Sequence, residues 1–393
     1  METYGKIPNV NAHLHTPYSF SAFENLTDAL ERAAEDNVKV VGINDFYSTD
    51  GYEEWDREAR KRHLYPLFNI EFISLQKEDQ DSGIRVNDPN NPGRTYISGK
   101  GLSCPPSLKE PFASQLAGVR AESNMQVKEM CDRVNLLLNA YDAGFDIDFE
   151  NIENFMAKGL VRERHLAKAL RMCTYIHFKN EPVEIKSFLE KIFNGKTLKS
   201  DIFDYAGVEN EIRGNLLKAG GAAFVPEDPK TFLPLEDVCN IIIAAGGIPT
   251  YPFLGDDANG KFTDFERDIE KAMKTLKQRK IYSVEFITTR NRIDVLEEYA
   301  GYFHDNSFVV TFGTEHNTPA MEPVLLHARG NTLLTNRLKQ INYDGACIIA
   351  AHQKLVRNGK TGYIDANGNA DADNRDRYIK MGDELIQNIS WIK

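Results

Sequence analysis

Short apolar runs alternate with amphipathic segments along most of the chain. Residues 38–43 and 308–313 are rich in β-branched and aromatic side chains, which is typical of buried strands. Segments 25–36, 234–245 and 292–303 instead repeat their apolar positions with the period of a helix. Strands and helices that alternate in this way favour an α/β fold with a parallel sheet.

Polar side chains of the kinds used in catalysis follow several of these predicted strands. Asp45 comes after the predicted strand 38–43, Glu71 after residues 65–70, Glu285 after residues 282–284, and Glu315 and His316 after residues 308–313. The carboxyl ends of parallel strands meet on one rim of a barrel. Because the candidate residues come from many separate strands, we expect a closed barrel rather than an open sheet.

Two histidines, His13 and His15, are separated by one residue at the end of the first predicted strand. Alternation along a strand points both imidazoles to the same face. Such a pair at a strand end is a common way to hold a divalent metal. Two ordinary surface histidines would give the same spacing, so both interpretations stand at this point.

The middle of the chain breaks the alternation. Residues 105–220 have helical patterns and no clear strand, which predicts a helical insertion attached to the rim after the third strand. Residues 123–126 have the letters of a capping box and predict a helix start there. We therefore expect a first barrel part in residues 1–104, the insertion in 105–220, and a second barrel part in 221–393 that ends in a helix.

The insertion offers a candidate anion site. Arg164 and His165 lie near a predicted helix start, where free backbone N–H groups and cationic side chains favour phosphate or carboxylate. A charged helix start that faces solvent is the alternative interpretation.

The stretch from residue 76 to residue 104 is dense in glycine, proline, asparagine and aspartate, and it predicts a long irregular loop. Its place directly after Glu71 would put it over the barrel mouth, where Arg85, Arg94 and Lys100 would make it cationic. Disorder is the alternative for this stretch.

The order of these motifs resembles the PHP (polymerase and histidinol phosphatase) superfamily over most of the chain. His13 and His15 resemble its first motif, Glu71 its bridging glutamate and His316 its last histidine. The resemblance implies a distorted (β/α)7 barrel with a helical insertion domain, and up to three divalent metals for phosphoester hydrolysis. Some phosphatases of the family have a similar insertion, with a histidine before an Ala-x-Ala-Leu run like the one that follows His165.

The sequence also departs from the family pattern. Phe46 and Tyr251 stand where the family has ligand histidines, and Glu315-His316 replaces an Asp-x-His motif. A phenyl ring has no lone pair for a metal, and a phenol with a pKa near 10 is a poor ligand. Three metals would need more donors than remain. We therefore expect about one ion, Zn or Mn with Fe or Mg as alternatives, in a three- or four-ligand site.

The expected roles follow from these positions. An ion in such a site would lower the pKa of its bound water towards roughly 7. The sequence thus predicts a metal-dependent hydrolase of a small anionic substrate, with a phosphoester as the first choice. A degenerate barrel that binds a metabolite, or one that performs a lyase or isomerase step, is the alternative. The expected metal ligands are His13, His15, Glu71 and His316; the catalytic residues Asp45 and Glu315; and the substrate-binding residues Arg164, His165, Arg290, Tyr251 and Glu285.

Composition indicates which binding partners and which cell compartment we expect for the protein. The 393 residues carry a net charge of -11, which argues against a nucleic-acid surface, so a local basic patch must attract an anionic substrate. The five cysteines are scattered without a Cys-x-x-Cys motif, which favours reduced thiols in a cytoplasm. We expect no membrane association, because no signal peptide and no long apolar run is found. No feature of the sequence points to a particular oligomeric state.

Overall fold

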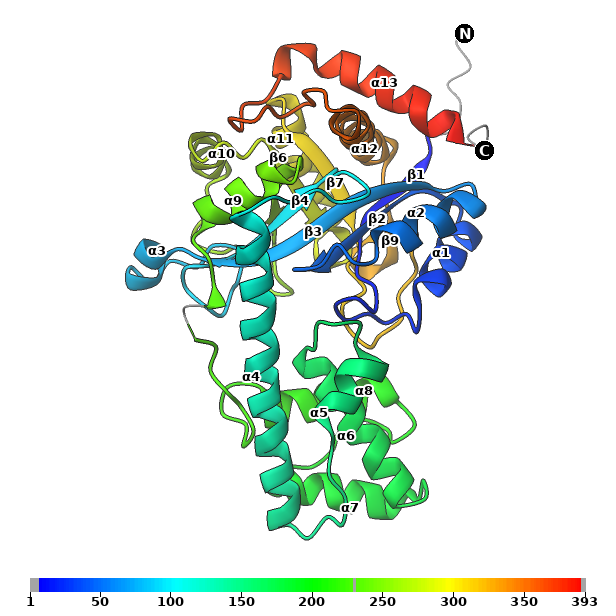
Figure 1. Ribbon diagram of the computed structural model, residues 1–393, viewed down its shortest axis with the longest axis vertical. Helices are drawn as coiled ribbons and strands as arrows, with labels where there is room; N and C mark the ends of the chain where they lie inside the picture. The colour runs from blue at the N-terminus through cyan, green and yellow to red at the C-terminus, as the bar shows by residue number, and fades with distance from the viewer. Residues whose placement is uncertain (1–6, 229–230, 390–393) are drawn as a thin grey trace.

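The computed structural model describes residues 7–228 and 231–389. Within them, seven strands form one sheet in the order β1-β2-β3-β4-β5-β6-β7. β1 and β7 approach each other through a bridge between Leu14 and Glu315, so the sheet curls into a nearly closed barrel (Figure 1). The predicted α/β barrel is confirmed. The strands are β1 (Asn9–Leu14), β2 (Val38–Phe46), β3 (Tyr65–Leu75), β4 (Arg94–Lys100), β5 (Ile248–Phe253), β6 (Ser283–Ile287) and β7 (Val309–Gly313).

β4 corrects the prediction of an irregular loop in residues 76–104. That stretch contains the short helix α3 (Lys77–Asp81) and then β4, which pairs antiparallel with both β3 and β5. The glycines on both sides of β4 hide its alternation of residue types in the sequence. As a result Lys100, expected on a loop, lies on a strand and is completely buried.

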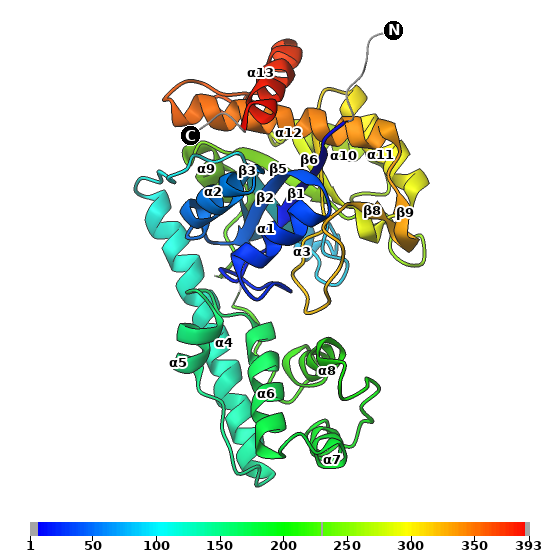
Figure 2. The ribbon, with the colours of Figure 1, turned by 90° about the vertical axis from the view of Figure 1, so that its right-hand side faces the viewer.

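Helices cover the outside of the barrel (Figure 2). Asn25 caps the first of them, because its side chain accepts a hydrogen bond from the Asp28 N–H. Their inward faces join the outward faces of the strands in one large apolar core. The helices are α1 (Leu26–Glu35), α2 (Tyr52–Lys61), α9 (Leu235–Ala244), α10 (Ile269–Gln278) and α11 (Ile293–Asp305).

The amino end of the barrel is closed by two further helices, α12 (Asn336–Arg357) and α13 (Arg375–Gln387). They pack with Val10, Tyr65 and Val309, which lie near the starts of their strands. The sequence analysis did not identify α12, because most of its length is buried and the helix lacks a simple polar face. The C-terminal helix, expected over residues 376–392, is present as α13, and residues 390–392 lie outside the described residues.

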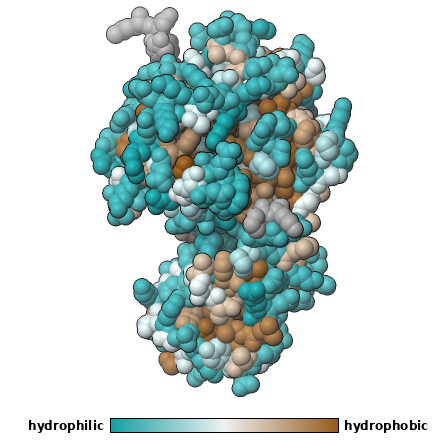
Figure 3. Space-filling model, turned by 90° about the vertical axis from the view of Figure 1, so that its left-hand side faces the viewer, coloured by the Kyte–Doolittle hydropathy of each residue, from teal (hydrophilic) through white to brown (hydrophobic). Residues whose placement is uncertain are grey.

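The insertion forms a second body below the barrel (Figure 1), and a space-filling view shows a narrower waist between the two (Figure 3). Its buried apolar residues, between Val127 and Val225, form a cluster of their own. Residues 123–126 lie inside a long helix, so the predicted helix start there is wrong: the chain is already helical from Phe112. The helices are α4 (Phe112–Ala140), α5 (Phe149–Asn151), α6 (Glu163–His177), α7 (Pro182–Ile192) and α8 (Tyr205–Ile212).

Glycine permits a close contact between α12 and the barrel. A Cβ at Gly345 would lie 2.0 Å from the Val310 carbonyl oxygen, which no side chain can tolerate. Gly345→Ala should therefore lower the free energy of unfolding by about 1–3 kcal/mol, because α12 must move away from β7. Urea denaturation measures this change.

Gly118 provides the matched control. It lies exposed in α4, and a Cβ there would meet no atom within 4 Å. Gly118→Ala should raise the free energy of unfolding by about 0.5–1 kcal/mol through helix propensity alone. A Gly345→Ala protein as stable as the wild type would contradict the packing argument.

Candidate metal centre

Three side chains converge at the carboxyl end of the barrel. His13 lies on β1, His15 directly after it, and Glu71 lies on β3. The two imidazole Nε2 atoms are 3.1 Å apart, and Glu71 Oε2 lies 3.5 Å from that of His13 and 3.1 Å from that of His15. All three residues are buried. This is the group of side chains that can hold a metal ion among the described residues.

The outer ring nitrogens fix the tautomers of both histidines. His13 Nδ1 lies 3.1 Å from Glu285 Oε1 and donates to that carboxylate. His15 Nδ1 lies 3.1 Å from the hydroxyl of Ser19, which itself donates to Asp45 Oδ1 at 2.6 Å. The Ser19 oxygen therefore accepts from His15. Both Nε2 atoms are left with a lone pair, and these lone pairs face the same point as Glu71 Oε2.

A divalent ion fits this arrangement. Ligand atoms about 2.0–2.1 Å from a tetrahedral ion are separated by about 3.3 Å, which matches the three separations given above. Within the described part of the chain, Glu71 Oε2 has no hydrogen-bond donor although it is buried. The lone pairs of His13 Nε2, His15 Nε2 and Glu71 Oε2 repel each other when no proton lies between them. The site therefore favours a bound cation.

When no metal is bound, a proton on His13 can act as the cation of the site. Burial lowers the pKa of His13, but the carboxylates of Glu285 and Glu71 outweigh it and raise that pKa to about 9. Burial opposes ionisation of Glu71, yet the two histidines hold its pKa below the usual value. A metal ion would therefore displace a proton from His13 when it binds.

A buried lysine and an amide lie beside the histidines. Lys100 Nζ lies 2.7 Å from Glu285 Oε2 and donates to the carbonyl of Ala12 and to Asn44 Oδ1. The Asn44 amide nitrogen lies 3.1 Å from His13 Nδ1 and 2.9 Å from its Nε2. An atom almost equally far from both nitrogens lies along neither lone pair, so it leaves the lone pair of His13 Nε2 free. The sequence analysis missed both roles.

Asp45 was expected to be catalytic, but its carboxylate is used inside the protein. Its oxygens accept from the Thr16 backbone N–H at 2.7 Å, the Thr16 hydroxyl at 2.5 Å and the Ser19 hydroxyl. It is also buried, and burial raises its pKa. Asp45 therefore orients His15 through Ser19 and does not face the site.

Glu285 was expected to bind substrate, but it is completely buried on β6. Its oxygens contact His13 and Lys100 and accept from the Ser98 hydroxyl at 2.8 Å. Its contacts make it a positioning group for His13, with no access for a substrate.

His316 was expected to be a metal ligand, and the structure turns it away. Its Nδ1 lies 2.7 Å from the Thr314 hydroxyl and its Nε2 2.9 Å from the Glu322 carbonyl. The cause is local: Glu315 and His316 both have left-handed φ angles, of 63° and 57°. The chain therefore turns sharply directly after β7, and the imidazole stacks on Phe23.

Arg290 follows β6 and Glu315 follows β7, and their side chains form an ion pair. Arg290 Nη2 lies 2.5 Å from Glu315 Oε2, which also accepts from the Asn317 amide at 2.9 Å. Arg290 is partly exposed, whereas Glu315 is nearly buried. Because Glu315 is already paired, its geometry gives no independent support for its expected catalytic role.

Tyr251 was expected near the substrate, and its strand register places it on the other face. Tyr251 pairs with Val284 on β6, whereas its neighbour Thr250 pairs with Ser283. Thr250 and Ser283 share the interior face with Glu285, so Tyr251 points outward. There its hydroxyl donates to Glu266 at 2.9 Å.

The insertion brings Arg162 and Arg164 to aromatic side chains at the mouth of the barrel. The Arg162 guanidinium lies 5.0 Å from the ring centre of Phe46, which in turn stacks on His15 at 5.1 Å. Arg164 lies over Phe20, a residue of the loop after β1, at 5.7 Å. Phe46 thus takes no part as a ligand, but it connects the metal centre to the insertion.

His165 does not add a charge to this mouth. Its Nδ1 accepts from the Arg162 backbone N–H at 2.9 Å, which caps α6. Burial lowers its pKa to about 3, so the ring is neutral. His165 therefore positions Arg162, and its expected role as a direct anion ligand finds no support in its geometry.

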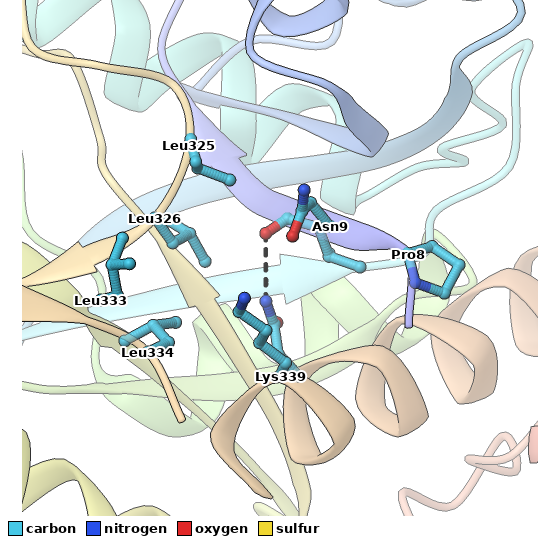
Figure 4. A pocket seen from close by; sticks show the side chains of 9 residues that line it. Pro8, Asn9, Leu325, Leu326, Leu333, Leu334 and Lys339 are labelled. Atoms are coloured by element: carbon cyan, nitrogen blue, oxygen red, sulfur yellow. Dashed lines mark hydrogen bonds between the residues drawn. The ribbon is translucent and has the colours of Figure 1, made fainter. Parts of the chain in front are cut away.

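A small pocket lies at the other end of β1 (Figure 4). Leu325, Leu326, Leu333 and Leu334 line it, opposite Pro8 and beside the short strands β8 (His327–Ala328) and β9 (Thr332–Leu333). It holds no cluster of titratable groups and lies away from His13. The titratable groups that could serve in catalysis therefore lie at the carboxyl end of the barrel.

Among the described helices, none has the length and apolarity needed to cross a membrane.

The metal centre makes a direct prediction. Purified protein from metal-supplemented medium should contain about one divalent ion per chain, and His15→Asn should lose it, because one of only three converging donors is removed. Elemental analysis measures the content. His316→Asn is the control: it removes an equally buried imidazole outside the cluster and should keep the ion. Equal metal loss in both variants would contradict this ligand assignment.

Comparisons with known proteins agree with this geometry at the level of the fold. No family model matches the sequence, so the resemblance to the PHP superfamily is not confirmed in that way, and no curated protein matches it. A structure from Bifidobacterium adolescentis, described as a candidate metal-dependent phosphoesterase, is similar with a TM-score of 0.54 and 14% identity, over 86% of this chain and 97% of that one. An amidohydrolase structure from Chromobacterium violaceum, with bound sulfate and no metal, is similar with a TM-score of 0.52 and 16% identity, over 85% and 96%. The chain thus has the fold of these barrels, with a buried His-His-Glu cluster that can hold a metal.

Proposed function

We propose that this protein is a metal-dependent hydrolase of a small anionic substrate, a phosphoester in the first place, and a divergent member of the PHP superfamily. The observation that carries the proposal is the convergence of His13 Nε2, His15 Nε2 and Glu71 Oε2 on one buried point. The similar barrel described as a candidate phosphoesterase supports the choice of substrate class.

His13, His15 and Glu71 would hold the ion. When bound, a divalent ion supplies Lewis-acid chemistry, in which it polarises a phosphoryl oxygen and lowers the pKa of water. Glu285 and the Asp45–Ser19 pair keep the two imidazoles oriented for it.

The cations of the mouth would bind the substrate's anionic group. Arg162, the N-cap of α6, lies over Phe46, which stacks on His15, and Arg164 in the first turn of α6 lies over Phe20. Guanidinium groups bind phosphate oxygens in pairs and hold them in a fixed orientation. The mouth has cations from both bodies, since Arg290 comes from the barrel. The insertion would also keep bulk water from the bound group.

The proposed activity is tested with a panel of small phosphoesters. The protein loaded with Mn or Zn should release phosphate from at least one of them, and removal of the ion with a chelator should abolish turnover until metal is added back. Phosphate release is the measurement. A protein that holds its ion but turns over none of the panel would favour the metabolite-binding or lyase alternative.

The role of the insertion is tested by substitution. Arg162→Gln and Arg164→Ala should each lower kcat/KM by about tenfold or more, because each removes a cation from the anionic group, while the metal content stays unchanged. Arg57→Ala is the control: it removes an arginine of α2 that is 59% exposed and pairs with its helix neighbour Glu58. Normal kinetics in both insertion variants would assign these arginines to structure alone.

A further inference from the structure

Lys100 is the cation at the centre of the barrel, and no step proposed above uses it. Its side chain is completely buried, as is that of its partner Glu285. An ammonium has three protons, and three oxygen atoms surround it: Glu285 Oε2 at 2.7 Å, the Ala12 carbonyl at 3.2 Å and Asn44 Oδ1 at 3.3 Å. Burial lowers the pKa of Lys100, while the ion pair with Glu285 and the two carbonyl-type oxygens favour its charged form.

These acceptors are the kind that a hard divalent ion would use. A carboxylate, a backbone carbonyl and an amide oxygen are typical ligands of Mg or Mn, and the Ser98 hydroxyl lies against the same carboxylate. The lysine ammonium is itself a compact point charge. The side chain of Lys100 thus places a positive charge among these oxygen atoms, where a divalent ion would otherwise bind.

Glu285 connects this ammonium to the metal centre. One of its oxygens lies 3.1 Å from Nδ1 of His13, and the other lies 2.7 Å from Lys100 Nζ. The carboxylate therefore lies between a ligand histidine and a fixed cation. A buried carboxylate without such a partner would carry a large desolvation cost.

We propose that the Lys100 ammonium occupies the place of a second divalent cation in the barrel and so limits the centre to a single ion. The inference rests on the proposed metal-dependent function, because it assumes that His13, His15 and Glu71 hold the first ion. Lys100 is a positioning residue in this role: it fixes Glu285, and Glu285 fixes His13.

Two substitutions of Lys100 distinguish the effect of its positive charge from the effect of the volume that its side chain fills. Lys100→Ala opens a cavity lined by oxygen atoms and removes the ammonium, so the variant should bind about two Mn²⁺ per chain where the wild type binds about one. Lys100→Met also removes the charge but fills the space with an apolar chain, and it should stay at about one. Equilibrium dialysis followed by metal analysis gives the stoichiometry.

A small amine adds a control within the same variant. Ethylammonium can enter the cavity of Lys100→Ala and replace the lost side chain, so it should displace the second Mn²⁺ and leave the first. If Lys100→Ala binds about one Mn²⁺ at saturation, as the wild type does, the proposal is overturned.

A charge cycle keeps the proposal testable if Lys100→Ala does not fold. Glu285→Gln keeps an acceptor for His13 but leaves the ammonium uncompensated, so the first Mn²⁺ should bind about tenfold more weakly. Lys100→Met leaves the carboxylate uncompensated and should bind the first ion more tightly by a similar factor. The double variant should return to the wild-type affinity. Single variants that leave the affinity unchanged, or shift it in the same direction, would refute the compensation.

The same measurements distinguish a failure of the proposed metal-dependent function from a failure of the role proposed for Lys100. If the wild type binds no Mn²⁺ at all, the proposed metal-dependent function fails. If the wild type binds about one ion and the Lys100 variants behave as it does, the function stands and only the role assigned to Lys100 is lost.

Discussion

Charge compensation inside the barrel is the constraint on which the rest of the structure depends. Glu71 and Glu285 are buried between strands, where an unpaired carboxylate is strongly unfavourable. Lys100 compensates Glu285, whereas Glu71 faces only two imidazoles. The charge of the first carboxylate is thus compensated by a lysine of the protein itself, and the second needs a proton or a metal ion. This asymmetry explains why the centre offers one coherent place for a cation.

The surrounding structure serves to hold this arrangement rigid. Asp45 acts on His15 through Ser19, and Glu285 acts on His13 directly, so each imidazole has its own buried carboxylate behind it. α12 closes the opposite end of the barrel, which excludes water from below. The end that α12 leaves open is the mouth, where the insertion places Arg162 over Phe46 and Arg164 over Phe20.

The mouth also explains how a protein with a net charge of -11 could attract an anion. Arg162 is the N-cap of α6 and Arg164 lies in its first turn, and the neutral His165 accepts a hydrogen bond from the Arg162 backbone N–H. A local cluster of cations acts over a short distance, whereas the overall charge is screened by salt. Phe46, which cannot bind a metal, supports the guanidinium of Arg162 with its ring face.

The sequence by itself determined the properties that depend on local periodicity. The barrel class follows from alternating strands and helices, and the shared face of His13 and His15 follows from their spacing. Only the tertiary structure decided which way the other residues point. A shift of one position turns a strand residue to the opposite face, which is why Thr250 faces inward and Tyr251 outward. Two left-handed residues turn His316 away after β7, and long-range pairing of an antiparallel strand carries Lys100 into the centre.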